Sequence, residues 1–353
     1  PERSAKGPDT VPAPPAIKSP TANPAVAARR TYDFGEEVTA QFRHDVLAKL
    51  VDDLRAFTDE SNGVTASVAR RLTQSLGIRK LTIEDHAREW AEASTRITAN
   101  PKYRGLKLNP QLGLIPLGAD DASTLEEFCD SVTGEPPQRS AHGALVVTEA
   151  TALVFVLIPS GTFHMGAQKH DAQGANYEPL ALDAEGPVTE VKLGAFLLSK
   201  YEMTQGQWQR ACNSSPSFHT SETLREVDLR HPVEQISWDD CAERLRQFGC
   251  VLPTEAQWEY ACRAGTTTPW HTGSSASTLQ GFANLADNSL LKERPDVSVE
   301  PSIDDGHLAH APVGSYAPNA FALHDMHGTV YEWCPDAFGS YDHPSPRRGH
   351  GIR

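Results

Sequence analysis

The sequence predicts an α+β protein in which a small helical segment precedes a domain with low regular secondary structure. In the first part of the chain, apolar residues recur every four positions, at Val38, Phe42, Val46, Leu50 and Leu54. A period near 3.6 is typical of an amphipathic helix. From about residue 144 onward, short β-branched runs are separated by loops rich in Gly, Pro, Asn and Asp. This pattern indicates short strands and turns with few long helices.

The composition limits the class of protein and its partners. The 353 residues are 39% hydrophobic, which is enough for one sizeable core, and the net charge of -14 argues against nucleic acid or a membrane surface as partner. The six cysteines lack CxxC spacing, so they indicate neither a zinc site nor a disulfide framework. No apolar run is long enough to span a membrane, and no signal peptide is visible. We therefore expect a cytoplasmic protein. Because no Met begins the sequence, we also expect it to be a fragment of a longer, multidomain product.

Four regions follow one another along the chain. Residues 1–31 are rich in Pro and Ala and are expected to form a disordered linker. Residues 32–100 form the helical segment, in which Asn62-Gly63 ends the first helix and a shorter helix covers 68–76. A third helix, capped by Thr82 with Asp85, is expected to run to about Thr98.

Residues 101–143 are rich in Pro, Gly and Leu and are expected to connect the helical segment to the main domain. Ser123 is predicted to cap a short helix over 125–129. The region has no motif tied to chemistry, so a structural role is expected for it.

The main domain is assigned to residues 144–353. Strands are predicted at 144–147 and 153–158, and the segment 162–165 is expected to pair back on the second strand as a hairpin. Further strands are predicted at 188–193 and 196–201.

Three short helices in this domain are predicted from their caps. Thr204, Ser237 and Thr254 are expected to be N-caps, with Trp208 packed inward. Gly249 and Gly265 are expected to end the second and third of these helices.

The stretch 312–333 (PVGSYAPNAFALHDMHGTVYEW) holds the candidate site chemistry. Asp325, Gly328 and Glu332 place two carboxylates around a flexible bend. Such bends suit a hard cation such as Ca²⁺, which takes carboxylate and carbonyl oxygens together. On spacing alone, a glycine turn with solvated acidic side chains is the simpler interpretation.

Three blocks resemble the formylglycine-generating enzyme (sulfatase-modifying factor) family. They are residues 155–166 (FVLIPSGTFHMG), residues 252–261 (LPTEAQWEYA) and the stretch 312–333. The resemblance implies a formylglycine-generating-enzyme fold, related to C-type lectin-like domains, for residues 144–353. It also implies an oxidoreductase that uses oxygen to oxidise a peptidyl cysteine to formylglycine. Ala322 stands where the family has a Gly that meets a special backbone angle.

The resemblance further implies two structural Ca²⁺ sites and a melting temperature that depends on Ca²⁺. One site would combine the side chains of Asn284 and Asp305 with the carbonyls of Leu285 and His307. The other would combine the side chains of Asp325 and Glu332 with the carbonyls of Gly328 and Val330.

No catalytic residue is assigned in this sequence. The family's copper(I)-binding cysteine pair belongs to a block that would follow Arg353, so we expect the domain to be incomplete at its C-terminus and this chain to be inactive. Copper would be a cofactor only if the natural protein has those cysteines, and its substrate would then be a peptidyl or small thiol. Cys334 is expected to be structural.

Other chemistries and a rival function were weighed. A related branch uses three histidines for iron, but the pairs His307/His310 and His324/His327 have the wrong spacing and lie in the wrong region. No serine-triad, phosphate-loop or kinase motif is present in these residues, although a protein kinase fused upstream would be consistent with the connector. The alternative function is a non-catalytic, Ca²⁺-stabilised lectin-like binding module of a bacterial signalling protein.

Overall fold

The computed structural model describes residues 38–59, 63–339 and 341, so the predicted linker 1–31 and part of the Asn62-Gly63 turn lie outside the described residues. The chain divides into two compact units, residues 1–71 and 72–353, which are described separately. In the first unit, helix α1 (Val38–Thr58) confirms the amphipathic pattern, and none of its residues is buried. Helix α2 (Val64–Arg79) begins in this unit and ends in the second.

The second unit begins with a helical turn and a helix whose cap differs from the prediction. The π-helical turn η1 (Lys80–Glu84) precedes α3 (Ala87–Ala99), and the N-cap residue His86 makes no side-chain cap. Thr82 does not cap this helix, because its hydroxyl donates to the Ile78 carbonyl at 2.6 Å. Trp90 and Ile97 on α3 are buried in the main core.

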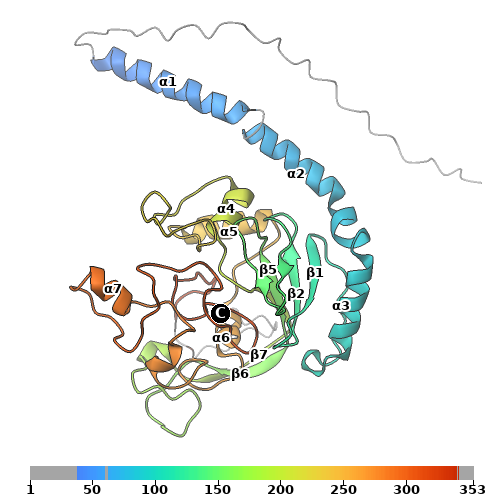
Figure 1. Ribbon diagram of the computed structural model, residues 1–353, viewed down its shortest axis with the longest axis vertical. Coiled ribbons are helices and arrows are strands. Elements are labelled where there is room, and N and C mark those ends of the chain that lie inside the picture. The colour runs from blue at the N-terminus through green and yellow to red at the C-terminus, as the bar shows by residue number, and fades with distance from the viewer. Residues whose placement is uncertain (1–37, 60–62, 340, 342–353) are drawn as a thin grey trace, which may run out of the picture. The chain divides into compact units, whose positions relative to one another are not determined.

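The main sheet has four antiparallel strands in the order β1-β2-β5-β8 (Figure 1). These are β1 (Leu114–Ala119), β2 (Glu126–Asp130), β5 (Val154–Ile158) and β8 (Phe196–Ser199). The predicted helix over 125–129 is therefore wrong. Leu125 and Phe128 are fully buried and β2 pairs with β1 and β5, so tertiary packing overrides the local helix signal.

The predicted hairpin between 153–158 and 162–165 is also wrong. Strand β6 (Gly161–Met165) pairs with β7 (Thr189–Leu193), and β5 pairs with β8 instead. The Tyr260 hydroxyl donates to the Pro159 carbonyl and fills the space beside Gly161, where a Cβ atom would collide with it. This side chain holds the turn between the two strands open. A separate two-stranded ladder joins β3 (Gln138–Arg139) to β4 (Leu145–Val146).

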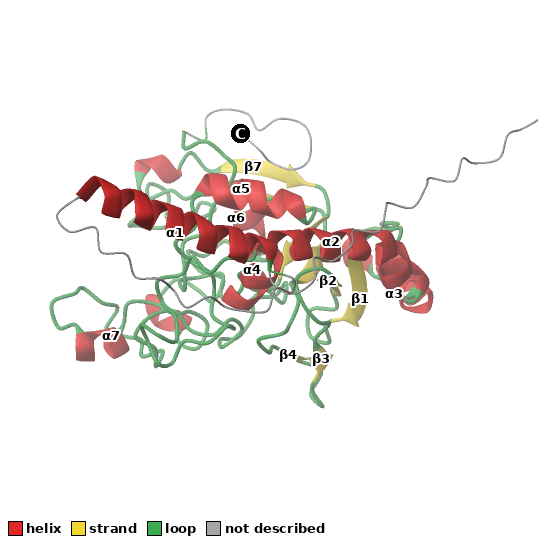
Figure 2. Ribbon diagram, turned by 90° about the horizontal axis from the view of Figure 1, so that it is seen from above, coloured by secondary structure: helices red, strands yellow, loops and turns green. Residues whose placement is uncertain are grey.

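The capped helices form where the sequence predicts them. Thr204, Ser237 and Thr254 accept hydrogen bonds from the backbone at the starts of α4 (Gln205–Cys212), α5 (Trp238–Gln247) and α6 (Glu255–Arg263). The short helices η2 (Pro101–Tyr103), η3 (Asp183–Glu185), η4 (Ala276–Leu279) and α7 (Asn288–Glu293) complete the described set. Long loops separate these elements, in agreement with the predicted α+β class of low regular content (Figure 2). None of the described helices is long and apolar enough to cross a bilayer.

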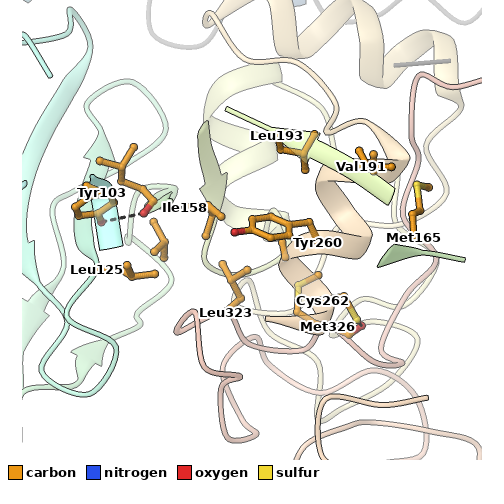
Figure 3. Packing of buried hydrophobic residues seen from close by; sticks show 14 of the residues in the cluster. Tyr103, Leu125, Ile158, Met165, Val191, Leu193, Tyr260, Cys262, Leu323 and Met326 are labelled. Atoms are coloured by element: carbon orange, nitrogen blue, oxygen red, sulfur yellow. Dashed lines mark hydrogen bonds between the residues drawn. The ribbon is translucent and has the colours of Figure 1, made fainter. Parts of the chain in front are cut away.

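The main core joins the sheet, α3, α6 and the stretch that follows Asn319. Tyr260 and Cys262 of α6 lie beside Leu323 and Met326, two residues that flank Asp325 (Figure 3). Because Leu323 and Met326 are buried, the backbone between them is held in place from both sides. The core therefore fixes the position of the Asp325 carboxylate.

Candidate metal centre

The loop that carries Asp325 has an unusual backbone. Ala322, Asp325 and Thr329 have φ angles of 60°, 58° and 60°, and Gly328 has 87°. Residues other than Gly rarely adopt this left-handed conformation, and they hold it only where the surroundings impose it. Ala322 thus has the special angle that the resemblance implied. The Asn319 side chain helps to impose the geometry, since its Oδ1 accepts from the Phe321 and Leu323 amides.

At the second predicted Ca²⁺ site, Asp325 has an unused acceptor. The residue is 3% exposed, and its Oδ2 accepts from the Gly314 amide at 2.6 Å. Its Oδ1 has no hydrogen-bond partner among the described residues. Burial raises the pKa of this carboxyl above its usual range. A buried carboxylate oxygen without a partner is costly, and a bound cation would remove the cost.

Glu332, the other side-chain ligand predicted for this site, is reachable from solvent. Its Oε2 accepts from the Trp258 indole Nε1 at 3.2 Å. Protein atoms crowd the carboxyl, and this desolvation, together with the negative charge of Asp325, raises its pKa. The residue as a whole nevertheless keeps an exposed surface, so an ion can approach it from water.

At the first predicted site, the side chains of Asn284 and Asp305 lie together, and the Asp305 carboxylate already accepts hydrogen bonds from protein groups. Asp305 Oδ2 accepts from Asn284 Nδ2 at 3.0 Å and from the Leu285 amide at 2.8 Å. Asp305 Oδ1 accepts from the His307 amide at 2.9 Å. These contacts place all four predicted residues in one cluster. Because the carboxylate is saturated with donors, this site fits a cation less well than the second one.

The two sites adjoin through a close backbone contact. The Thr329 amide donates to the Asn284 carbonyl at 2.9 Å, and Asn284 and Gly328 form an isolated parallel bridge. A Cβ atom on Gly328 would collide with that carbonyl oxygen, so a glycine is required for the approach.

An acidic groove of about 1740 Å³ contains the second site and part of the first. The described residues that line it include no Lys or Arg. They include seven acidic residues: Glu202, Glu234, Glu255, Glu300, Asp325, Glu332 and Asp336. A groove lined by one sign of charge raises the local concentration of the opposite ion. The lining also includes Gly328 and Val330, whose carbonyls are predicted ligands.

Glu202 is one of the groove residues that the sequence did not single out as site residues. It lies between β8 and α4, and both of its carboxylate oxygens are withdrawn from solvent. Burial raises its pKa well above the usual range, and the charges of Asp325 and Glu332 raise it further. The sequence signal was an acidic residue between a predicted strand and a capped helix, which does not reveal the direction of its side chain.

The described side chains do not by themselves form a ready-made metal centre. Within the described ranges, no three His, Cys, Asp or Glu side chains converge in a way that could hold an ion. The second predicted site fits Ca²⁺ in another way, because it pairs two carboxylates with two backbone carbonyls in a strained bend.

The histidine rings contact one another and aromatic neighbours, and His219, His310 and His327 line the acidic groove. His310 packs against His219 and His231 with ring centroids 5.3 and 5.2 Å apart. His327 stacks on His271, and the His324 ring contacts the Tyr316 carbonyl. Within the described residues, the side chains of His307, His310, His324 and His327 do not converge as three metal ligands.

All six cysteines are free, and burial raises the pKa of each thiol. Such surroundings disfavour the reactive thiolate form. Cys334 lies beside Trp238, whose indole donates to the Cys334 carbonyl at 3.0 Å.

Comparison with known proteins gives a match over the region that contains the candidate site. Residues 144–351 match the model of the sulfatase-modifying factor enzyme 1-like domain. The chain is 27% identical over 216 residues to the formylglycine-generating enzyme of Thermomonospora curvata, covering 48% of this chain and 67% of the relative. It is 29% identical over 212 residues to the enzyme of the same name from Streptomyces coelicolor, covering 48% and 64%.

More distant matches share the region. The hercynine oxygenase of Mycobacterium tuberculosis is 27% identical over 182 residues, covering 41% of this chain and 38% of the relative. Among solved structures, PvdO from Pseudomonas aeruginosa has 22% identity and a TM-score of 0.41, covering 59% of this chain and 78% of that one. The matches span about two thirds of the length of these curated relatives or less.

Proposed function

Because the chain belongs to the sulfatase-modifying factor enzyme 1-like family, we propose that the complete protein oxidises a peptidyl cysteine to formylglycine with oxygen. The observation that carries this proposal is the family match over residues 144–351, which includes the loop of Asp325. Relatives with the name formylglycine-generating enzyme support it.

The reaction is balanced by oxygen and an external thiol. The substrate C–S bond breaks and a C=O bond forms, so the cysteine gives up two electrons and its sulfur leaves as sulfide. Oxygen takes four electrons, and the other two come from a thiol reductant; one oxygen atom enters the aldehyde and the other leaves as water. No described residue of this chain is assigned a role in these steps.

This chain's own contribution in the proposal is a scaffold held by Ca²⁺. Asp325 and Glu332 would hold one ion with the carbonyls of Gly328 and Val330. Asn284 and Asp305 would hold a second with the carbonyls of Leu285 and His307. Ca²⁺ would supply charge neutralisation in the acidic groove and no redox chemistry.

The activity is tested with a peptide that contains Cys-x-Pro-x-Arg, oxygen, copper(I) and a thiol reductant. The natural protein is expected to convert the cysteine to an aldehyde that a hydrazide reagent labels, with release of sulfide. An unlabelled peptide after incubation with the natural protein would contradict the proposal.

A second candidate function is a non-catalytic, Ca²⁺-stabilised binding module. The specific observation in its favour is the acidic groove, in which the described lining has seven acidic residues and no basic one. Calorimetric titration with Ca²⁺ tests this property independently of catalysis. Binding of Ca²⁺ by a natural protein that forms no aldehyde would favour the second candidate, whereas a flat titration would exclude it.

A further inference from the structure

The buried carboxylate of Glu202 has no counter-charge among the described residues that line its groove. Neither of its oxygens makes a hydrogen bond of normal geometry to any described residue. The Thr329 hydroxyl lies near enough to favour the charged form, but it does not meet hydrogen-bond geometry either. Burial of a carboxylate in this way is expensive unless a partner neutralises it.

The nearby acidic side chains further disfavour the ionised form of Glu202. Asp325 and Glu332 act on Glu202, and the charge of each raises its pKa. The closest lysine in sequence, Lys200, is engaged elsewhere, because its Nζ lies 2.6 Å from Glu127 Oε1. No Lys or Arg lines the described part of the groove. Three carboxyl groups therefore share one groove, and no Lys or Arg of the described residues lines it.

The position of Glu202 is fixed by regular structure on both sides. The Lys200 amide donates to the Val154 carbonyl at 2.7 Å, which continues the β5–β8 pairing. Thr204 caps α4 in a capping box with Gln207. The backbone on both sides of Glu202 is thus held by the scaffold, and the side chain lines the groove.

We propose that Glu202 supplies a third carboxylate charge to the cation site of Asp325 and Glu332 and so raises its affinity for a hard cation. The inference rests on the cation site proposed above. Because the three side chains do not converge in the described arrangement, Glu202 lies outside the set of ligands and acts on the ion through its charge. It is a positioning residue.

Trp258 provides a built-in reporter for this site. Its indole Nε1 is 3.2 Å from Glu332 Oε2, so any cation held by Glu332 lies close to the ring. Terbium(III) takes the same oxygen ligands as Ca²⁺, and excitation of a nearby indole sensitises its emission. Titration of the 353-residue chain with terbium(III) is expected to give emission that saturates and that Ca²⁺ reverses.

The variant Glu202→Gln removes the charge and keeps the shape of the side chain. It is expected to need about tenfold more terbium(III) for half-saturation, because the ion loses the attraction of a nearby negative charge. Glu332→Gln, which removes a proposed ligand, is the positive control. Glu234→Gln is the matched negative control, since Glu234 lines the same groove and its Oε1 accepts from the His219 amide, a bond that Gln preserves.

A second measurement separates a charge role from a purely structural one. In EDTA, Glu202→Gln is expected to melt at the same temperature as the wild-type chain or higher, because the buried carboxyl that it replaces has no hydrogen-bond partner among the described residues. In Ca²⁺, its stabilisation is expected to be smaller than that of the wild-type chain.

Each outcome has a distinct meaning. No sensitised emission from the wild-type chain would overturn the cation site itself, and with it the scaffold part of the proposed function. Equal terbium(III) affinity for the wild-type chain and Glu202→Gln would overturn only the role of Glu202. A lower melting temperature of Glu202→Gln in EDTA would also overturn it, because the carboxylate would then serve the fold without an ion.

Discussion

At the scale of single residues, the candidate site combines a strained backbone with unused acceptors. Ala322, Asp325 and Thr329 are left-handed, and Asp325 Oδ1 has no partner among described residues. Asp325 and Glu332 could be predicted from the sequence because a motif carries them. Glu202 could not, since the direction of a side chain at a strand end is set by tertiary packing and not by its neighbours in sequence.

The contact at Gly328 gives a first prediction. Gly328→Ala is expected to lower the free energy of unfolding by about 3 kcal/mol or more, because the added methyl group meets the Asn284 carbonyl and the φ angle is positive. Gly281→Ala is the matched control, with a φ of 81° and open space around it. Gly281→Ala should lower the free energy of unfolding by only about 1 kcal/mol. If urea unfolding gives equal losses of free energy for the two variants, the contact between Gly328 and the Asn284 carbonyl does not limit the residue at position 328.

His310 gives a prediction of pH dependence. Burial and the neighbouring His231 and His219 lower its pKa from 6.5 to about 4. The unfolded chain takes up this proton near pH 6.5 and the folded chain only near pH 4, so the stability from this residue is complete above pH 6.5 and is lost as the pH falls toward 4. His310→Gln is expected to lose less free energy of unfolding between pH 7 and pH 4.5 than the wild-type chain. An equal loss, measured in urea at both pH values, would show that His310 does not titrate in this way.

At the scale of elements, local signals predicted the capped helices and failed for strand pairing. Thr204, Ser237 and Thr254 each satisfy a backbone amide within three residues, so the sequence alone was sufficient. Strand β6 pairs with β7, and Tyr260 packs beside Gly161 at the start of β6, so both contacts join residues that are far apart in the sequence. The strand β2 likewise follows from long-range burial of Phe128 against a helix-like local pattern.

The cap of α4 can be tested directly. Thr204→Ala is expected to lower the free energy of unfolding by about 1 kcal/mol, because the Gln207 amide loses its acceptor. Thr204→Ser keeps the oxygen and should recover most of the loss. A Ser variant as unstable as the Ala variant would mean that the methyl group matters more than the hydroxyl.

The strand β2 also carries a buried ionic network. Glu127 is fully buried, and its two carboxylate oxygens lie 2.6 Å from Lys200 Nζ and 2.6 Å from Arg139 Nη2. Removal of one partner from such a pair leaves the other charge buried and unpaired. Glu127→Ala is therefore expected to destabilise the chain by about 3–5 kcal/mol. Glu127 and Lys200 belong to one network, so the loss of unfolding free energy in the double variant Glu127→Ala/Lys200→Ala should be smaller than the sum of the losses in the two single variants. Additive losses, measured by urea unfolding, would contradict this coupling.

At the scale of the whole second unit, one core positions both the sheet and the acidic groove. Residues that were expected to form a connector supply β1 and β2 of the main sheet, and their side chains share a core with Leu323 and Met326. The α+β class and the family could be predicted from short motifs. The groove could not, because its lining comes from segments between Ala184 and Tyr341 that meet only in the folded chain.

The central claim is that this groove holds a cation, and thermal unfolding with and without Ca²⁺ tests it most directly. If the Ca²⁺ concentration is about 100 times the dissociation constant, the folded state gains about 2.7 kcal/mol. The melting temperature of the 353-residue chain is then expected to be about 5 °C or more higher in millimolar Ca²⁺ than in EDTA. Identical melting curves under the two conditions would contradict the claim.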